Sequence, residues 1–376
     1  TMSQSDFVRR LPGLGELRQG KPWLKRLHID PLLLLPLLLL AGYGLVVLYS
    51  AGGGSLDAIE RQGMSLGLAG VLMLIAAQID VAILRRWALV IHLGGTVLLI
   101  IVLLAGDDAK GATRWIDLQV LRFQPAEIMK LAMPLAVCRY LGDHHLPPTL
   151  PTVAVSMALI AVPTLLIAKQ PDLGSALLIA SSGLYALFLA GIRWLWIALA
   201  GLAGVLLAPA LWFLLRDYQR RRILTLIDPE ADPLGSSWNI IQSKIAIGSG
   251  GLHGKGWLAG TQSHLDFLPE SHTDFIFAVL AEEFGLVGVL LLFGLYLIIV
   301  ARGLWIAAKA PDLFQRLLAG SITLTFSVYA LVNVGMVSGV LPVVGVPLPL
   351  ISQGGTALVT LMLGFGVLMS IQTRTP

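Results

Sequence analysis

Long uncharged stretches recur along this 376-residue chain, and they limit its fold more than any other feature. Hydrophobic residues make up 56% of the sequence, whereas Asp, Glu, Lys and Arg together make up 13%. Apolar runs of about 20 residues are long enough to cross the hydrocarbon core of a bilayer. This composition lies outside the range of soluble globular domains and predicts a polytopic membrane protein.

We predict ten membrane-spanning helices from these runs. Their ranges are 31–50, 63–79, 87–105, 125–141, 150–168, 172–190, 194–215, 275–301, 316–339 and 350–371. The fourth contains Glu127 and Lys130, and the eighth contains Glu282 and Glu283; such residues normally face a bundle interior or a wet cavity. The expected fold class is all-α, a bundle of ten transmembrane helices with one long loop, 216–274, between helices seven and eight.

The distribution of Lys and Arg sets the expected orientation, because short cytoplasmic connections carry an excess of them. Most of these residues in the short connections fall on the side of the two termini. We therefore expect a basic cytoplasmic segment over 1–30, a membrane domain over 31–371 and a cytoplasmic tail over 372–376. The long loop 216–274 then lies outside the cytoplasm, and a connection of this length is usually functional.

Several kinds of site have no support in the sequence. The single cysteine, Cys138, cannot form an internal disulfide. There is no Walker P-loop, H-E-x-x-H, paired C-x-x-C or G-x-S-x-G motif, and no module of a soluble nucleic-acid-binding protein. The glycine-rich stretch 248–256 lacks the strand and helix context of a dinucleotide motif, so we interpret it as a flexible loop.

Acidic residues and histidines gather where the long loop meets the eighth span. Asp274 stands there with His272 and Glu270. A carboxylate beside a hydrocarbon boundary is costly to keep, which makes Asp274 a candidate functional residue. The alternative is structural, because an aspartate at this point could cap the helix by accepting backbone N–H bonds.

Two further segments place charges at the outer ends of spans. In Phe123-Gln-Pro-Ala-Glu-Ile-Met-Lys130, Glu127 and Lys130 lie three apart on one helix face, where they could bind substrate or only hold two helices together. Asp172 follows Gln170-Pro and opens the sixth span, either as a cap or as a site carboxylate.

Basic residues on the outer side run against the usual charge bias and point to an anionic ligand. Lys and Arg recognise phosphate through charge-assisted hydrogen bonds. The candidates are Lys110, Arg114, Arg122, Lys244 and Lys255. Each one alone could be an ordinary loop charge.

Five segments together resemble the SEDS family (shape, elongation, division and sporulation) of bacterial inner-membrane glycosyltransferases. They are Gly111-Ala-Thr-Arg-Trp-Ile, Phe123-Gln-Pro-Ala-Glu-Ile-Met-Lys130, Gln170-Pro-Asp-Leu-Gly, Phe267-Leu-Pro-Glu-Ser-His-Thr-Asp-Phe-Ile-Phe277 and Gly345-Val-Pro-Leu-Pro-Leu-Ile-Ser-Gln-Gly-Gly355. The resemblance covers about 31–371, and the stretch from Gly260 to Glu270 is similar to the elongation branch of the family rather than the division branch.

The resemblance implies polymerisation of lipid II into peptidoglycan glycan strands at the outer face of the inner membrane, with Asp274 as the catalytic carboxylate. It implies that Glu127, Lys130 and Asp172 line the same central cavity. A class B penicillin-binding transpeptidase and other membrane proteins of the elongation complex are the implied partners.

In that reaction a sugar hydroxyl attacks the anomeric carbon of a glycan on undecaprenyl pyrophosphate. A carboxylate can act as general base, and cations can stabilise the departing pyrophosphate. Whether a divalent cation such as magnesium or manganese assists is open in the sequence, although Asp274, Asp172 and Glu127 could supply oxygen ligands. The rival interpretations are a transporter that flips lipid-linked precursors, and a scaffold without enzymatic activity.

Overall fold

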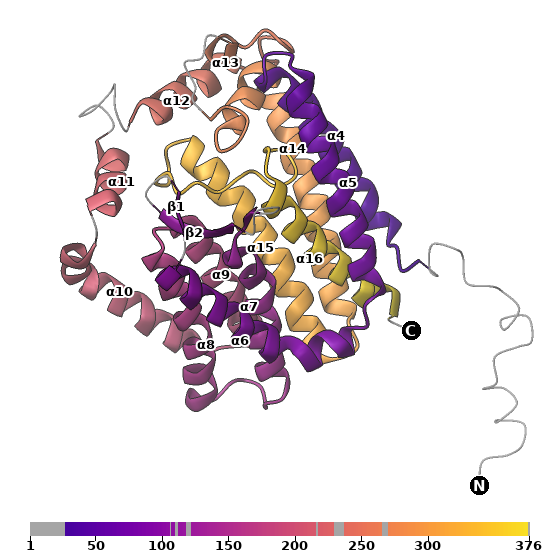
Figure 1. Ribbon diagram of the computed structural model, residues 1–376, viewed down its shortest axis with the longest axis vertical. Coiled ribbons are helices and arrows are strands. Elements are labelled where there is room, and N and C mark those ends of the chain that lie inside the picture. Colours follow the sequence, from indigo (N-terminus) through magenta and orange to yellow (C-terminus); the bar gives the residue numbers. More distant parts are fainter. Residues whose placement is uncertain are drawn as a thin grey trace, which may run out of the picture.

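The computed structural model describes residues 27–105, 107–109, 112–117, 122–215, 217–228, 237–264 and 270–374. Most of these residues form helices (Figure 1). The helices are α4 (Pro31–Ala51), α5 (Leu56–Gln78), α6 (Val81–Ala105), α7 (Pro125–Gly142), α8 (Leu150–Lys169), α9 (Leu173–Leu189), α10 (Trp194–Leu214), α11 (Asp217–Ile227), α12 (Trp238–Gly250), α13 (Thr261–His264), α14 (Ile276–Lys309), α15 (Leu313–Val337) and α16 (Gly355–Arg374).

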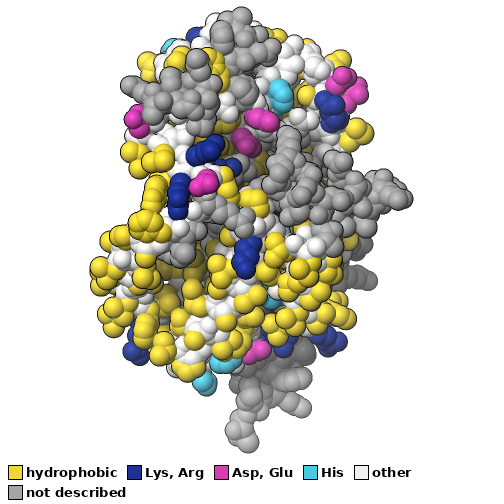
Figure 2. All heavy atoms as spheres, turned by 60° about the vertical axis from the view of Figure 1, so that its left-hand side comes forward, with side chains coloured by type: hydrophobic (Ala, Val, Ile, Leu, Met, Phe, Trp, Pro, Cys, Tyr) yellow, Lys and Arg dark blue, Asp and Glu magenta, His cyan; other side chains and the backbone are white. Residues whose placement is uncertain are grey.

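Seven described helices are long and apolar enough to cross a membrane: α4, α5, α6, α8, α14, α15 and α16. Shorter apolar segments lie in α9 and α10. Figure 2 shows a mainly hydrophobic belt on one face, between charged side chains in the upper half and others near the lower edge. That arrangement is typical of a protein that spans a bilayer.

The described helices confirm the all-α class, with one local exception. A small antiparallel sheet lies between α6 and α7, with strand order β1-β2-β3 (Asp107–Ala109, Ala112–Asp117 and Arg122–Phe123). The strands pair Asp108 with Thr113 and Ile116 with Phe123. Strands this short leave a weak sequence pattern, which does not distinguish them from an irregular outer loop.

The observed helix boundaries differ most from the predicted ones where charged residues extend a helix beyond its apolar run. α5 begins at Leu56 rather than 63, because a turn containing Asp57 and Arg61 precedes the apolar part. α14 continues to Lys309 and α16 to Arg374, within the predicted tail 372–376. The Arg374 guanidinium binds Asp80 at 3.3 Å and the Gln78 carbonyl at 2.7 Å, which fastens this end to the turn after α5.

The core is formed by α7, α9, α14, α15 and α16. α5 packs along α16, α7 packs against α6 and α9, and α15 packs against α9 and α14. Most side chains of α7 are buried, and none is exposed. By contrast, α10 lies at the edge of the bundle with most of its described side chains exposed (Figure 1).

The described parts of the predicted long loop include three helices, α11, α12 and α13, and part of the loop docks into a break in α14. Gly285 interrupts α14 with φ 61° and ψ −160°, a conformation that suits glycine. The backbone of 251–256 fills this break: Lys255 N donates to the Glu282 carbonyl, and Leu286 N donates to the Gly251 carbonyl, each at 3.0 Å. The interpretation of 248–256 as a flexible loop is therefore wrong, because these bonds satisfy backbone groups that the break exposes.

Candidate active site

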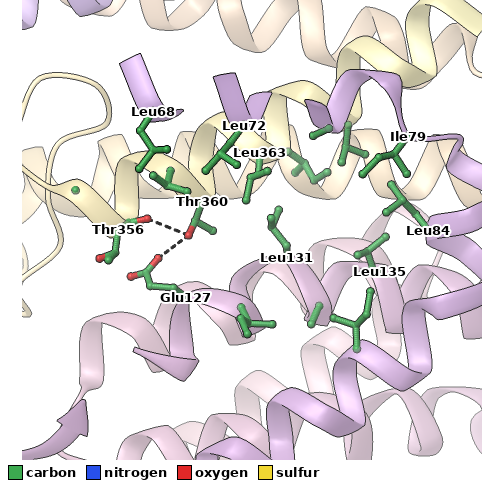
Figure 3. A pocket seen from close by; sticks show the side chains of 18 of the residues that line it. Leu68, Leu72, Ile79, Leu84, Glu127, Leu131, Leu135, Thr356, Thr360 and Leu363 are labelled. Carbon is green, nitrogen blue, oxygen red and sulfur yellow. Dashed lines mark hydrogen bonds between the residues drawn. The ribbon is translucent and has the colours of Figure 1, made fainter. Parts of the chain in front are cut away.

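Glu127 and Lys130 form a buried ion pair one helical turn apart on α7. Lys130 Nζ lies 2.6 Å from Glu127 Oε1, and the two side chains are 7% and 9% exposed. The second oxygen of Glu127 accepts a hydrogen bond of 2.9 Å from Thr360 on α16 (Figure 3). Lys130 also lies 5.4 Å from the centre of the Tyr329 ring on α15. The pair therefore joins three helices, as expected of a charged group inside the bundle.

Asp172 caps a helix and also contacts the segment that leads to Glu127. Its Oδ1 accepts from the backbone of Ser175 at 3.1 Å, which confirms the capping interpretation. Its Oδ2 accepts from Gln124 Nε2 at 2.8 Å. Because Gln124 stands at the start of α7, the helix that carries Glu127 and Lys130, this bond brings the two predicted segments together.

Asp274 does not cap α14, so that alternative is wrong. The residue at the cap position is Phe275, which makes no side-chain cap bond. A Cβ added to Gly345, whose φ is 75°, would lie 3.5 Å from Asp274 Oδ2. The same short segment borders the start of α9, because a Cβ on Gly174 would meet the Val344 carbonyl at 2.7 Å. Asp274 and the helix that Asp172 caps therefore pack against one loop, 344–346.

The surroundings of Asp274 favour a carboxyl group that holds its proton more tightly than usual. Burial raises the pKa of Asp274, the nearby Glu270 carboxylate raises it further, and Arg222 on α11 lowers it. A carboxylate with a raised pKa is better matched to accepting a proton near neutral pH. Arg222 comes from the long loop, so α11 contributes to the electrostatics of this site.

The two residues predicted beside Asp274 have local contacts. Thr273 Oγ1 donates to the Glu270 carboxylate at 3.0 Å, within the turn that precedes α14. His272 Nδ1 lies 3.1 Å from Ser271 Oγ and 3.3 Å from the Ala51 carbonyl at the end of α4. Both residues lie close to Asp274 in the chain, and His272 also links the turn to α4.

The predicted basic residues do not form one described cluster. Lys255 binds the fully buried Glu282 carboxylate at 2.7 Å, so it neutralises a protein charge. Lys244 is exposed and lies beside Gly339, near the end of α15. Arg114 is part of β2, but its side chain lies outside the described residues, as does Lys110 entirely.

An apolar groove leads away from Glu127. Its volume is about 550 Å³, and α5, α6, α7 and α16 line it with residues such as Leu68, Leu131 and Leu363 (Figure 3). Glu127 and Thr360 are among its few polar residues. The part of the groove away from Glu127 is lined by apolar residues such as Leu84 and Leu135. The groove therefore suits a hydrocarbon chain whose polar end lies near Glu127.

The described residues do not fit a preformed metal centre. No group of three or more His, Cys, Asp or Glu side chains gathers among them in a way that could hold an ion. Glu127 and Asp172 direct their oxygens at Lys130, Thr360, Gln124 and the Ser175 amide. These oxygens are therefore already committed to partners within the protein.

Four residues of the site were missed by the sequence. Gln124 lies within a predicted motif but is not among the predicted site residues, and Arg222, in the long loop, is not among them either. Tyr329 and Thr360 had no signal, because they lie far from Lys130 and Glu127 in the chain and meet them only through helix packing.

Comparison with known proteins agrees with this geometry. The family model for FtsW, RodA and SpoVE, described as cell cycle proteins, matches residues 31–376. The peptidoglycan glycosyltransferase MrdB of Escherichia coli K12 is 52% identical over 358 residues, covering 94% of this chain and 96% of that protein. A probable peptidoglycan glycosyltransferase FtsW of Geobacter metallireducens is 37% identical, with 92% and 95% covered.

Solved structures are similar over the same length. A chain from a peptidoglycan synthase complex, described as coordinating polymerization and crosslinking, is 34% identical with a TM-score of 0.79 and covers 91% of this chain and 97% of its own. The rod shape determining protein RodA of Thermus thermophilus is 27% identical with a TM-score of 0.70, covering 92% and 97%. This chain therefore belongs to the FtsW, RodA and SpoVE family, the SEDS family that its motifs resemble, and it is RodA-like within it.

Proposed function

We propose that this chain is a peptidoglycan glycosyltransferase that polymerises lipid II at the outer face of the bacterial inner membrane during cell elongation. Similarity over nearly the whole chain to proteins named peptidoglycan glycosyltransferase supports the activity. The observation that carries the choice of substrate is the apolar groove of about 550 Å³ that ends at Glu127. A lipid-linked sugar needs this combination, because its prenyl chain stays in hydrocarbon while its head group reacts among polar residues.

Asp274 is the general base in this proposal. The 4-hydroxyl of one lipid-linked disaccharide attacks the anomeric carbon of the other glycan, and Asp274 takes the hydroxyl proton. A glycosidic bond forms while the bond from the anomeric carbon to the pyrophosphate oxygen breaks, and undecaprenyl pyrophosphate leaves with the electron pair. The raised pKa of Asp274 and its freedom from capping support this role.

Cations stabilise the negative charge that develops on the pyrophosphate. Lys130 is the described candidate nearest the groove, since it pairs with a residue that lines it. We further assign Lys110, Arg114 and Lys244 to head-group binding, on the charge bias of the outer loops. The contact of Lys255 with Glu282 favours a structural role for that residue instead.

The proposed topology has ten spans, α4 to α10 and α14 to α16, with both termini in the cytoplasm. The seven long apolar helices and the two shorter ones support nine of these spans, and α7 is the tenth because it is buried at their centre. Arg85 and Arg139 pair with Asp143 between α7 and α8, and Arg302 pairs with Asp30 before α4. These arginines lie where cytoplasmic connections are proposed, which agrees with the positive-inside rule.

The proposed partners are a class B penicillin-binding transpeptidase and other membrane proteins of the elongation complex. The similarity to a chain from a complex that couples polymerization and crosslinking supports this assignment. The proposed base, Asp274, belongs to this chain, so the activity is assigned to the chain itself rather than to a partner.

The test uses the purified full chain in liposomes that contain fluorescent lipid II. Glycan polymer that a muramidase degrades is the expected product. A transporter would instead move lipid II between leaflets and leave it monomeric, and that result would overturn the proposed activity. An assay of leaflet exposure on the same samples separates the two outcomes.

A further inference from the structure

Three successive backbone carbonyls before α14 accept hydrogen bonds from distant parts of the chain. Gln353 N donates to the His272 carbonyl at 2.9 Å, and Ser352 Oγ donates to the Thr273 carbonyl at 2.6 Å. Asn333 Nδ2 donates to the Asp274 carbonyl at 2.9 Å. We call these three donors the carbonyl clamp. The clamp fixes the backbone of Asp274, whose own side chain makes no cap bond to α14.

Asn333 donates two hydrogen bonds from one side-chain nitrogen. Its side chain is fully buried on α15, and the same Nδ2 also donates to the Val346 carbonyl at 2.7 Å. An amide group placed against two carbonyl oxygens must present its nitrogen to them, since its own oxygen can only accept. Val346 follows Gly345, the residue that borders the Asp274 carboxylate. Asn333 therefore ties the backbone of Asp274 to the loop beside its side chain.

Ser352 anchors the clamp on its other side. Its hydroxyl accepts from Leu348 N at 2.8 Å while it donates to the Thr273 carbonyl. Its backbone carbonyl accepts from Gln62 Nε2 on α5 at 3.3 Å. The clamp thus connects the turn before α14 to α5 and to the loop before α16. Displacement of any one of these parts would move Asp274.

We propose that Asn333, together with Ser352, is a positioning residue that holds Asp274 at the reacting hydroxyl, an inference that rests on the proposed function. Neither side chain needs to touch substrate. Their effect on the reaction is geometric, because a reacting group misplaced by about 1 Å can lose on the order of 100-fold in rate.

The first experiment measures kcat and KM for lipid II with the full chain. Asn333→Leu keeps a similar volume and removes both donated bonds. We expect kcat to fall by roughly 100-fold while KM stays close to that of the wild type, because the base moves and the substrate contacts do not. Ser327→Ala is the matched control: this hydroxyl, on the same helix, donates at 3.2 Å only to Thr323 of its own helix, and both constants should remain unchanged.

A second measurement reports the position of residue 274 without any activity. In an Asp274→Cys variant the reagent labels only position 274, because the native thiol of Cys138 is fully buried and inaccessible. Adding Asn333→Leu should release the backbone and raise the rate of labelling by a water-soluble thiol reagent several-fold, whereas adding Ser327→Ala should not. If the wild-type chain forms no polymer, the proposed function fails, but this comparison still tests the clamp.

Equal labelling rates with and without Asn333→Leu would overturn the proposal, as would an unchanged kcat in a variant that melts normally. Should Asn333→Leu accumulate poorly, Ser352→Ala replaces it in both assays, since it removes only the bond to Thr273 and the acceptor for Leu348. An unchanged kcat and labelling rate in Ser352→Ala would then contradict the positioning role.

Discussion

The buried pair on α7 should make Lys130→Met strongly destabilising. Both side chains of the pair are nearly inaccessible and lie 2.6 Å apart. Removing one partner of a buried pair typically costs about 3–5 kcal/mol, because the other charge stays buried and uncompensated. Thr360 would still donate to Glu127 at 2.9 Å, and a hydrogen bond to a charged group contributes about 1.5–3 kcal/mol. That bond is present in the wild type and in Lys130→Met alike, so it does not replace the lost ammonium. We expect the free energy of unfolding to fall by about 3 kcal/mol.

Thermal unfolding can be followed with a fluorogenic thiol dye, because Cys138 lies on the same helix and is fully buried until α7 opens. Lys130→Met should melt well below the wild type, and Glu127→Gln should melt in between, since its amide oxygen can still accept from Lys130. A wild-type melting temperature for Lys130→Met would refute the reasoning. The charge-swapped variant, Glu127→Lys with Lys130→Glu, should recover only part of the stability, because a carboxylate would then face the Tyr329 ring. It should not recover the activity, because the cation proposed to stabilise the pyrophosphate would no longer stand at position 130. Full activity in the swapped variant would show that the pair is only structural.

Three further predictions concern single sites. When kcat/KM is measured against pH, the apparent pKa on the acidic side should lie above the usual aspartate value of about 3.9, because burial raises the pKa of Asp274 and activity is lost as pH falls through that pKa. Glu270→Gln should lower this apparent pKa, and an unchanged value would contradict the assignment. Asp172→Ala should lose about 1 kcal/mol of stability with its cap bond, whereas Asp172→Asn should keep it; equal melting of both variants would remove the capping role. Lys255→Met should make 250–262 more sensitive to proteolysis, because the Glu282 carboxylate would stay buried without its ammonium partner. Adding Glu282→Gln should restore part of the resistance. Unchanged cleavage of the single variant would exclude this docking role.

The sequence predicts these candidate site segments because each combines charge with an apolar flank. Asp274, Asp172 and the Glu127–Lys130 pair all stand at or just inside the end of an apolar run, where hydropathy and charge together identify them. Their shared place near loop 344–346 and Tyr329 depends on how the helices pack. Helix packing is set by contacts between residues far apart in the chain, which a single sequence does not record.

Backbone geometry was the other feature that the sequence could not supply. The glycines at 248–256 suggested flexibility, yet they allow the backbone to enter the break at Gly285, where a side chain would collide. Asp274 and Asp172 looked equivalent as helix caps, but only Asp172 accepts the cap bond. The turn before α14 is held instead through its carbonyls, which accept hydrogen bonds from Asn333 and Ser352 on later segments.

The central claim is that Asp274 accepts the proton of the attacking sugar hydroxyl. The most direct measurement compares glycan polymer formed from lipid II by the purified wild type, Asp274→Asn and the control Asp57→Asn, an exposed carboxylate in the first turn of α5. Loss of a general base typically costs about 10²–10⁴ in rate, so Asp274→Asn should form little or no polymer while melting like the wild type. Asp57→Asn should polymerise normally. Wild-type polymerisation by Asp274→Asn would contradict the account.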